Sequence, residues 1–185
     1  MKVLDLFMPD EAVENVYAVT PSFCAEMGVE GVVFDVDNTL VPYDAARPDE
    51  RLRAHLLSFP AAGIRVALVS NNSRERVEIF DRDLGFFAVP EARKPKKSAL
   101  APVLAHFSLP PEKVLLVGDQ LLTDVLTARK NGVRAVVVPP VKRRENLFFR
   151  FKRMLEAPLM RRYRRLRARK EKQISATGPT AGRKE

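Results

Sequence analysis

The sequence has little cysteine and no long apolar run. Its one cysteine, Cys24, cannot form an intramolecular disulfide and has no partners at a zinc-like spacing, so we expect a buried thiol in a reducing, cytoplasmic setting. The longest apolar runs, such as residues 135–141, fall far short of the roughly 20 residues that a membrane-spanning helix needs. The opening stretch MKVLDLFMPDE lacks the apolar segment of a secretory signal, so we expect neither export nor membrane crossing.

Nucleotide-binding motifs are also missing. Neither G-x-x-x-x-G-K-[ST] nor G-x-G-x-x-G occurs, so the sequence gives no support for a P-loop or for a dinucleotide-binding turn. Histidine is scarce as well, because only His55 and His106 occur. Both fall inside helical patterns, so we expect them to be structural rather than catalytic.

Charge is unevenly distributed along the 185 residues. The net charge is +9, but residues 142–172 hold 14 Lys and Arg against three Glu, a net +11. Residues 1–141 hold 16 basic and 19 acidic residues, a net −3. The sequence therefore predicts a core domain over residues 1–141, a basic arm over 142–172 and a disordered tail over 173–185.

Apolar runs of strand length alternate with helical patterns along residues 31–139. Near-continuous apolar strands separated by single helices are typical of an α/β fold with a parallel sheet covered on both faces. In such sheets ligands bind at the carboxyl ends of the strands. The predicted strands are 31–36, 64–69, 86–89, 114–118 and 134–139, and the predicted helices are 49–59, 73–84, 97–107 and 121–132.

Polar residues follow four of the predicted strands. Acidic residues are depleted from strands and are costly to bury unpaired, so their presence here favours chemistry over folding. Each cluster also has a simpler explanation, such as a helix cap, a solvated lysine or an exposed acid in a first helical turn. The clusters are DVDNT (35–39), SNNS (70–73), RKP (93–95) and GDQLLTD (118–124).

Together these clusters resemble the four motifs of the haloacid dehalogenase (HAD) superfamily of phosphohydrolases. FMPDEAVENV (7–16), VSNN, ARKP and GDQLLTDVL further resemble the YqeG-type subfamily, whose mitochondrial relatives dephosphorylate phosphatidylglycerophosphate. The resemblance covers about residues 4–165. It implies a three-layer, Rossmann-like HAD fold with a central, mainly parallel sheet.

Two acids, Asp35 and Asp37, are the predicted catalytic pair. Residues two apart on a strand project to the same side, so both can face one phosphorus, one attacking and the other handling protons. The resemblance implies that Asp35 is the nucleophile and Asp37 the general acid/base. It also favours a phosphatase, because related ATPases carry Thr at the position of Asp37 and dehalogenases lack an acid there.

Several acids in one crevice predict a metal ion. Two carboxylates about 4 Å apart repel by about 4 kcal/mol at an effective dielectric constant near 20, unless a cation lies between them. All-oxygen ligands beside a phosphate favour Mg²⁺, which we expect on Asp35, Asp119 and the carbonyl of Asp37. The resemblance implies that Asp124 supports this site, either through a metal-bound water or by orienting Lys94.

Fixed donors are needed for the phosphoryl oxygens, whose charge grows in the transition state. We expect the hydroxyl of Ser70, the backbone N–H of Asn71 and the charge of Lys94 to bind them, with Thr39 in a supporting place. Pro95 keeps Lys94 out of a helical conformation, which suits a loop residue that points into a crevice.

No cap domain fits between the motifs, because residues 38–69 and 71–93 each have room for one helix and one strand. The crevice should therefore be open, which suits substrates too large to enclose, such as a lipid headgroup, a protein or a nucleic-acid end.

The basic arm alternates apolar residues with arginines at helical spacing, and Pro158 should kink or restart the helix. Such a segment binds an anionic membrane surface, packs on the domain, or binds RNA.

The predicted function is a Mg²⁺-dependent phosphomonoesterase acting through an aspartyl-phosphate, with phosphatidylglycerophosphate at the cytoplasmic membrane face as the leading substrate. The alternatives are an RNA- or ribosome-associated protein with a HAD fold and a phosphatase of nucleic-acid ends. The sequence does not predict an oligomeric state.

Overall fold

A computed structural model describes residues 3–142 and 147–176 of the chain. The chain divides into two compact units, residues 1–145 and residues 146–185. The first unit is an α/β domain, and the second contains one long helix, α6. No helix in the described ranges has both the length and the hydropathy that crossing a bilayer requires.

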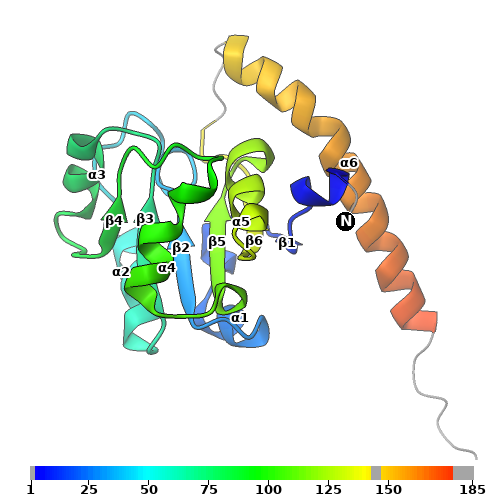
Figure 1. Ribbon diagram of the computed structural model, residues 1–185, viewed down its shortest axis with the longest axis horizontal. Coiled ribbons are helices and arrows are strands. Elements are labelled where there is room, and N and C mark those ends of the chain that lie inside the picture. Colours follow the sequence, from blue (N-terminus) through cyan, green and yellow to red (C-terminus); the bar gives the residue numbers. More distant parts are fainter. Residues whose placement is uncertain (1–2, 143–146, 177–185) are drawn as a thin grey trace, which may run out of the picture. The chain divides into compact units, whose positions relative to one another are not determined.

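A single six-stranded sheet forms the centre of the first unit, with helices on both of its faces (Figure 1). Every pair of neighbouring strands is parallel, which confirms the predicted fold class. The order across the sheet is β1-β6-β5-β2-β3-β4. The strands are β1 (Glu11–Ala12), β2 (Gly31–Phe34), β3 (Arg65–Val69), β4 (Phe87–Val89), β5 (Val114–Gly118) and β6 (Arg134–Val137).

The strand order reverses between β2 and β5. From β2 the chain builds outward through β3 and β4, and it then returns to the other side of β2 with β5 and β6. At such a reversal the connections leave toward opposite sides, which opens a crevice at the carboxyl ends of the two central strands. This is where a ligand site is expected.

Two of the helices that connect the strands, α2 and α3, begin at side-chain caps. Asp49 accepts a hydrogen bond from the Leu52 N–H at 2.7 Å and starts α2, and Ser73 accepts one from the Arg76 N–H at 3.4 Å and starts α3. The α-helices of the domain are α1 (Pro21–Glu26), α2 (Glu50–Ala61), α3 (Arg74–Asp81), α4 (Ala101–Phe107) and α5 (Leu126–Lys130). The other helical turns are η1 (Val3–Phe7), η2 (Val16–Ala18), η3 (Lys97–Ala99), η4 (Pro111–Lys113) and the π-helical turn η5 (Leu121–Val125).

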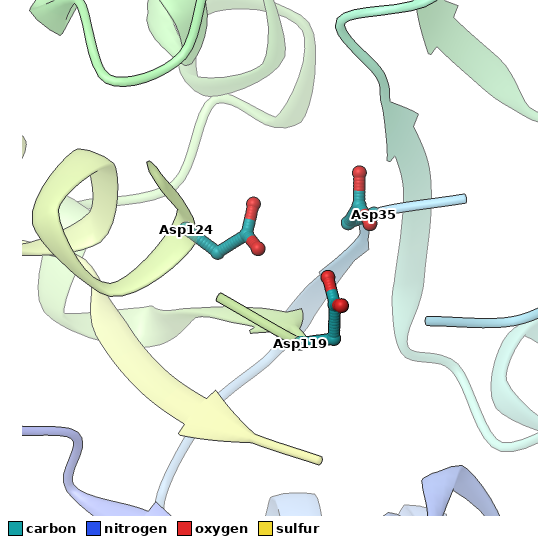
Figure 2. A group of neighbouring side chains, drawn as sticks. All are labelled: Asp35, Asp119 and Asp124. Carbon is teal, nitrogen blue, oxygen red and sulfur yellow. The ribbon is translucent and has the colours of Figure 1, made fainter. Parts of the chain in front are cut away.

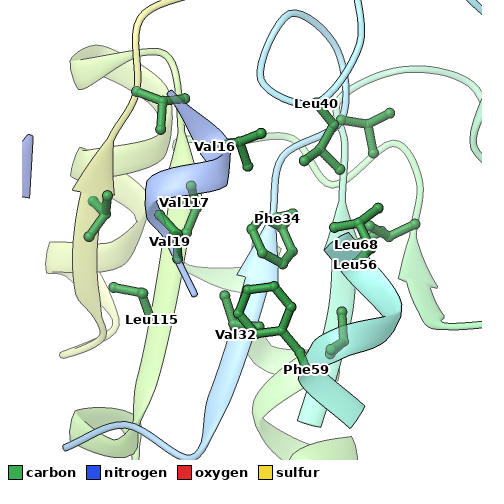
Figure 3. Close-up of a cluster of buried hydrophobic side chains, with 14 of the residues drawn as sticks. Val16, Val19, Val32, Phe34, Leu40, Leu56, Phe59, Leu68, Leu115 and Val117 are labelled. Carbon is green, nitrogen blue, oxygen red and sulfur yellow. The ribbon is translucent and has the colours of Figure 1, made fainter. Parts of the chain in front are cut away.

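A continuous apolar core lies between one face of the sheet and α2 (Figure 3). Val32 and Phe34 of β2 enter this core, and Phe34 meets Phe59 of α2 edge to face with ring centroids 5.4 Å apart. Each fully buried side chain of this kind contributes about 1.5–3 kcal/mol. Because side chains alternate along a strand, the other residues of β2 face α4, where Gly31 leaves room for the Phe107 ring.

The structure corrects several predicted boundaries. The first predicted strand ends at Phe34 rather than at residue 36, so Asp35 and Asp37 both follow β2 and the alternation of a strand does not orient them. The short edge strand β1 has no apolar run and was not predicted. No extra domain interrupts residues 38–93, which hold only α2, β3, α3 and β4 as regular elements, so the domain is capless as predicted.

The second unit contains helix α6, which runs from Leu147 to Ala176. It passes through Pro158 as one helix, so the predicted restart at this residue is wrong. It also continues beyond residue 172, where the predicted tail begins. The rest of the predicted tail, residues 177–185, lies outside the described residues.

Candidate active site

The carboxyl ends of the strands bring the predicted residues together at the reversal of strand order. Asp35 follows β2 and is still joined to the sheet, because its N–H donates to the Val117 carbonyl at 2.9 Å. Ser70 follows β3 and its N–H donates to the Val89 carbonyl at 3.0 Å. Asp119 follows β5 directly. The sheet therefore holds Asp35 and Ser70 through backbone hydrogen bonds, and Asp119 is placed by the end of β5.

Asp35, Lys94 and Asp124 form a buried ionic triad. The Lys94 Nζ lies 2.6 Å from Asp35 Oδ1 and 2.6 Å from Asp124 Oδ1. Burial alone would lower the pKa of Lys94, but Asp124 and Asp35 outweigh it and raise this pKa above its ordinary value. Lys94 is therefore a fixed positive charge inside the crevice. Asp124, whose role the sequence left open, orients Lys94 directly.

The second oxygen of Asp35 is also held. The Thr39 hydroxyl donates to Asp35 Oδ2 at 2.7 Å. With Lys94 on Oδ1 and Thr39 on Oδ2, the carboxylate of Asp35 has a defined orientation. A side chain held in this way is preorganised, so little entropy is lost when it meets a ligand.

Three carboxylates face a common space in this crevice, as Figure 2 shows for Asp35, Asp119 and Asp124. One oxygen from each lies within 4.8 Å of the others. Burial, with smaller contributions from Asp35 and Asp124, raises the pKa of Asp119 to about 8. Burial likewise raises the pKa of Asp35 to about 6, although Lys94 opposes this shift. Fully ionised, the three carboxylates would carry three negative charges, of which Lys94 balances one.

A divalent cation fits this cluster. The donors are carboxylate oxygens only, the set that Mg²⁺ prefers over metals that favour nitrogen or sulfur ligands. A cation there would also hold Asp35 and Asp119 in the ionised form that burial now disfavours.

Asp37 lies at the edge of the cluster, toward β3 and α3. Its Oδ2 accepts hydrogen bonds from the Asn72 side-chain amide at 3.0 Å and from the Ser70 hydroxyl at 3.3 Å. Its Oδ1 lies 3.2 Å from Arg76 Nη2. The carboxylate of Asp37 is thus oriented by groups other than those that hold Asp35.

Asn71 joins two of the predicted loops. Its side-chain Oδ1 accepts from the Lys94 N–H at 2.7 Å, and its Nδ2 donates to the Lys94 carbonyl at 3.0 Å. The sequence suggested only a backbone N–H of Asn71 for phosphate binding. The structure adds a second task, because the side chain of Asn71 holds the main chain of Lys94 in place.

The π-helical turn η5 places Asp124. A turn of this kind shifts the residues that follow it relative to an α-helix and is frequent at functional sites. The Gln120 N–H donates to Asp124 Oδ2 at 3.1 Å, which fixes the oxygen that does not contact Lys94. Gly118 makes room for this side chain, since a Cβ at that position would overlap the carboxyl group of Asp124.

Sequence reasoning missed three of the side chains around the site. Asn72 belongs to a polar run that was noted, but nothing distinguished its amide from that of Asn71. Gln120 donates from Nε2 to Asp119 Oδ1 at 3.0 Å and lies between the two acids of the fourth motif. Arg76 carries no signal in the sequence, because it reads as an ordinary basic residue in the first turn of a surface helix.

Comparison with known proteins agrees with this geometry. Residues 91–146 match the family model described as HAD-hydrolase-like. The chain is 37% identical over 154 residues to the probable phosphatase YqeG of Bacillus subtilis, covering 83% of this chain and 90% of that protein. It is also 28% identical over 174 residues to phosphatidylglycerophosphate phosphatase 1, chloroplastic/mitochondrial, of Arabidopsis thaliana, covering 85% of this chain but only 48% of that longer protein.

Solved structures share the fold. A hypothetical protein from Xanthomonas campestris superposes with a TM-score of 0.52 at 26% identity, over 65% of this chain and 73% of that one. A β-phosphoglucomutase-like protein from Thermotoga maritima has a TM-score of 0.51 at 16% identity, over 67% of this chain and 92% of that one, which is a likeness of fold alone. The sequence identity to YqeG, together with the parallel sheet and the four strand-end motifs, shows that the chain belongs to the YqeG-type phosphatases of the HAD superfamily.

Proposed function

We propose that this phosphatase is a Mg²⁺-dependent phosphomonoesterase that works through an aspartyl-phosphate on Asp35. The observation that carries the proposal is the convergence of three carboxylates, two buried and one half-buried, with Lys94 at the strand reversal. In this assignment Asp35, Asp119 and the backbone carbonyl of Asp37 hold the cation. When bound, the cation neutralises charge on the phosphoryl oxygens and keeps the nucleophile ionised.

The first step transfers the phosphoryl group to the enzyme. An oxygen of Asp35 forms a bond to phosphorus while the bond from phosphorus to the leaving oxygen breaks, and Asp37 gives its proton to that oxygen. Lys94, the hydroxyl of Ser70 and the N–H of Asn71 bind the phosphoryl oxygens as their charge redistributes. The dephosphorylated alcohol then leaves through the open side of the crevice.

The second step returns Asp35 to its free form. Water attacks phosphorus, Asp37 takes up the proton of that water, and the bond between phosphorus and the Asp35 oxygen breaks. Inorganic phosphate is released and Asp37 is again protonated for the next cycle. Both steps use the same two acids, and no histidine takes part.

The proposed substrate is phosphatidylglycerophosphate, presented by a membrane at its cytoplasmic face. Two observations support a large substrate of this kind: the domain is capless, and two relatives bear the name phosphatidylglycerophosphate phosphatase. Helix α6 offers a membrane-binding element, since apolar and basic side chains are exposed together on it. The exposed side chains include Met154, Leu155, Leu166, Arg161, Arg162, Arg164 and Arg165.

A substrate panel tests the lipid assignment. With Mg²⁺, the full chain should release phosphate from phosphatidylglycerophosphate in anionic vesicles with a kcat/KM at least about tenfold above that for glucose 6-phosphate, because remote parts of the lipid contribute binding energy.

Replacing Arg161, Arg162, Arg164 and Arg165 by Glu should slow turnover in vesicles, since each basic residue near the surface contributes about 1 kcal/mol to binding an anionic membrane. Turnover of a soluble short-chain analogue should stay unchanged.

Equal kcat/KM values for the lipid and for the sugar phosphate would contradict the lipid assignment. Salt-sensitive co-sedimentation with ribosomes, in the absence of vesicle binding, would instead favour the RNA-associated alternative that the +11 charge of residues 142–172 also permits.

A further inference from the structure

Arg76 connects α3 to the loop that follows the first catalytic motif. Its Nη1 donates to the Ala46 carbonyl at 2.8 Å and its Nη2 donates to the Ala45 carbonyl at 2.6 Å. The same Nη2 lies 3.2 Å from Asp37 Oδ1. The side chain is 14% exposed, so most of the guanidinium is removed from water.

The guanidinium is held in place by the backbone and not by Asp37. Two charge-assisted hydrogen bonds to carbonyl groups fix the plane of the group. The contact with Asp37 is within ion-pair distance, but its N–H is not aligned with Oδ1 as a hydrogen bond requires. The positive charge therefore stays beside Asp37 whether or not that carboxyl carries a proton.

The two oxygens of Asp37 have different surroundings. Oδ2 accepts hydrogen bonds from the Asn72 amide and the Ser70 hydroxyl. Oδ1 is buried and accepts no hydrogen bond from the described residues, with Arg76 as its charged neighbour. Oδ1 thus faces Arg76, and the fixed guanidinium limits where the Asp37 carboxyl points.

We infer that Arg76 is a positioning residue for Asp37. It fixes the direction of the Asp37 carboxyl toward the leaving oxygen and ties residues 45–46 of the neighbouring loop to the same helix. Its charge also offsets the negative charge that Asp37 carries after giving its proton away, beside a phosphoryl group that is itself anionic. This inference rests on the proposed role of Asp37 as the general acid.

A residue that acts through a general acid has a distinct kinetic signature. Protonation of the leaving oxygen matters most when the leaving group is a poor one, such as an alkoxide, and little when it is p-nitrophenolate. Loss of Arg76 should therefore slow hydrolysis of an alkyl phosphate far more than hydrolysis of p-nitrophenyl phosphate. A purely structural role would slow both by the same factor.

The test uses Arg76→Met, which keeps the length of the side chain and removes its charge. The matched control is Arg74→Met on the same helix, where Arg74 lies 3.8 Å from Glu78 with both side chains more than half exposed. Arg76→Met should lower kcat for glycerol 3-phosphate by about 10–100-fold and kcat for p-nitrophenyl phosphate by less than about threefold. Arg74→Met should leave both unchanged.

A double-mutant cycle decides whether Arg76 acts through Asp37. Asp37→Asn alone should show the same dependence on the leaving group, and adding Arg76→Met to it should cause little further loss with the alkyl phosphate. Arg76→Lys keeps the positive charge but cannot make both hydrogen bonds to the Ala45 and Ala46 carbonyls, so it should recover part of the activity on the alkyl phosphate. If Arg76→Met does not fold, Arg76→Lys takes its place in the test.

Three results would overturn the inference. The first is that Arg76→Met loses the same factor in kcat with both substrates, and the second is that the fold-losses of Arg76→Met and Asp37→Asn multiply fully in the double variant. The third is an Arg76→Lys variant with no more activity on the alkyl phosphate than Arg76→Met. If Asp37→Asn itself shows no dependence on the leaving group, the proposed function fails and not only this inference. If the loss of activity depends on the leaving group in Asp37→Asn but not in Arg76→Met, only the inference about Arg76 is wrong.

Discussion

Asp35→Asn is expected to reduce phosphate release by at least about 10⁴-fold while the domain stays folded. The amide has nearly the shape of the carboxylate but cannot form an acyl-phosphate, so covalent catalysis is lost. The remaining proposed phosphate-binding groups are expected to bind phosphate as before. Because burial raises the pKa of Asp35 to about 6, the ionised side chain opposes folding near pH 7, so in the cation-free protein the amide should leave the melting temperature unchanged or higher.

The control for Asp35→Asn is Asp44→Asn. Asp44 lies in the loop after the first motif and pairs with Lys142 at 2.6 Å, with both side chains about two-thirds exposed. This substitution makes the same chemical change outside the crevice, and activity should persist. An Asp35→Asn protein that kept more than a few per cent of the native rate would contradict the assignment of the nucleophile.

The second large effect concerns Mg²⁺ and pH. In the cation-free protein burial raises the pKa of Asp119 to about 8 and that of Asp35 to about 6, above the ordinary value of 3.8. A raised carboxyl pKa contributes stability that is complete below the unfolded-state pKa and is lost as pH rises through the folded-state pKa. The cation-free domain should therefore lose stability between about pH 4 and pH 8 from these two groups.

Mg²⁺ should restore this stability, and more so at pH 8 than at pH 5, because protons compete with the cation for the same oxygens. At a concentration 100 times its Kd a ligand stabilises by about 2.7 kcal/mol, which for a domain of this size corresponds to roughly 5–10 °C in melting temperature. Thermal unfolding in EDTA and in Mg²⁺ gives the Mg²⁺-induced shift in melting temperature, which is compared between pH 5 and pH 8.

Asp119→Asn is the matched variant for that experiment. It removes a proposed ligand and the group with the most strongly raised carboxyl pKa, so the cation-free variant should melt higher than the native protein at pH 8 and should respond little to Mg²⁺. A Mg²⁺-induced shift of equal size at pH 5 and pH 8, or one that persists in Asp119→Asn, would contradict a cation site built on this acid.

The strand ends made the site predictable from sequence. In a parallel sheet the carboxyl ends of all strands lie at one edge, so Asp35, Ser70 and Asp119 had to meet once their strands were recognised. The apolar runs of β2, β3 and β5 are long enough to be unambiguous. By contrast, β1 has only two residues and no pattern that would distinguish it from a loop.

Contacts made by helices and loops were not predictable. Arg74 and Arg76 share the first turn of α3, yet one is exposed and the other reaches Asp37, because only the fold places the loop carbonyls of Ala45 and Ala46 beside Arg76. A contact between Lys94 and Asp124 was one of two roles expected of Asp124, but the π-helical turn that places Asp124 is not indicated by periodicity. Pro158 was expected to kink or restart a helix, and the helix does not restart there.

The central claim is that Asp35 and Asp119 share one divalent ion beside the phosphorus that Asp35 attacks. A crystal structure with Mg²⁺ and a fluoride mimic of the phosphoryl group tests it most directly. The account predicts a single ion at about 2.1 Å from a carboxylate oxygen of each acid, and the mimic bound to an oxygen of Asp35. An ion that contacts only one of the two acids, or a mimic seated away from Asp35, would contradict it.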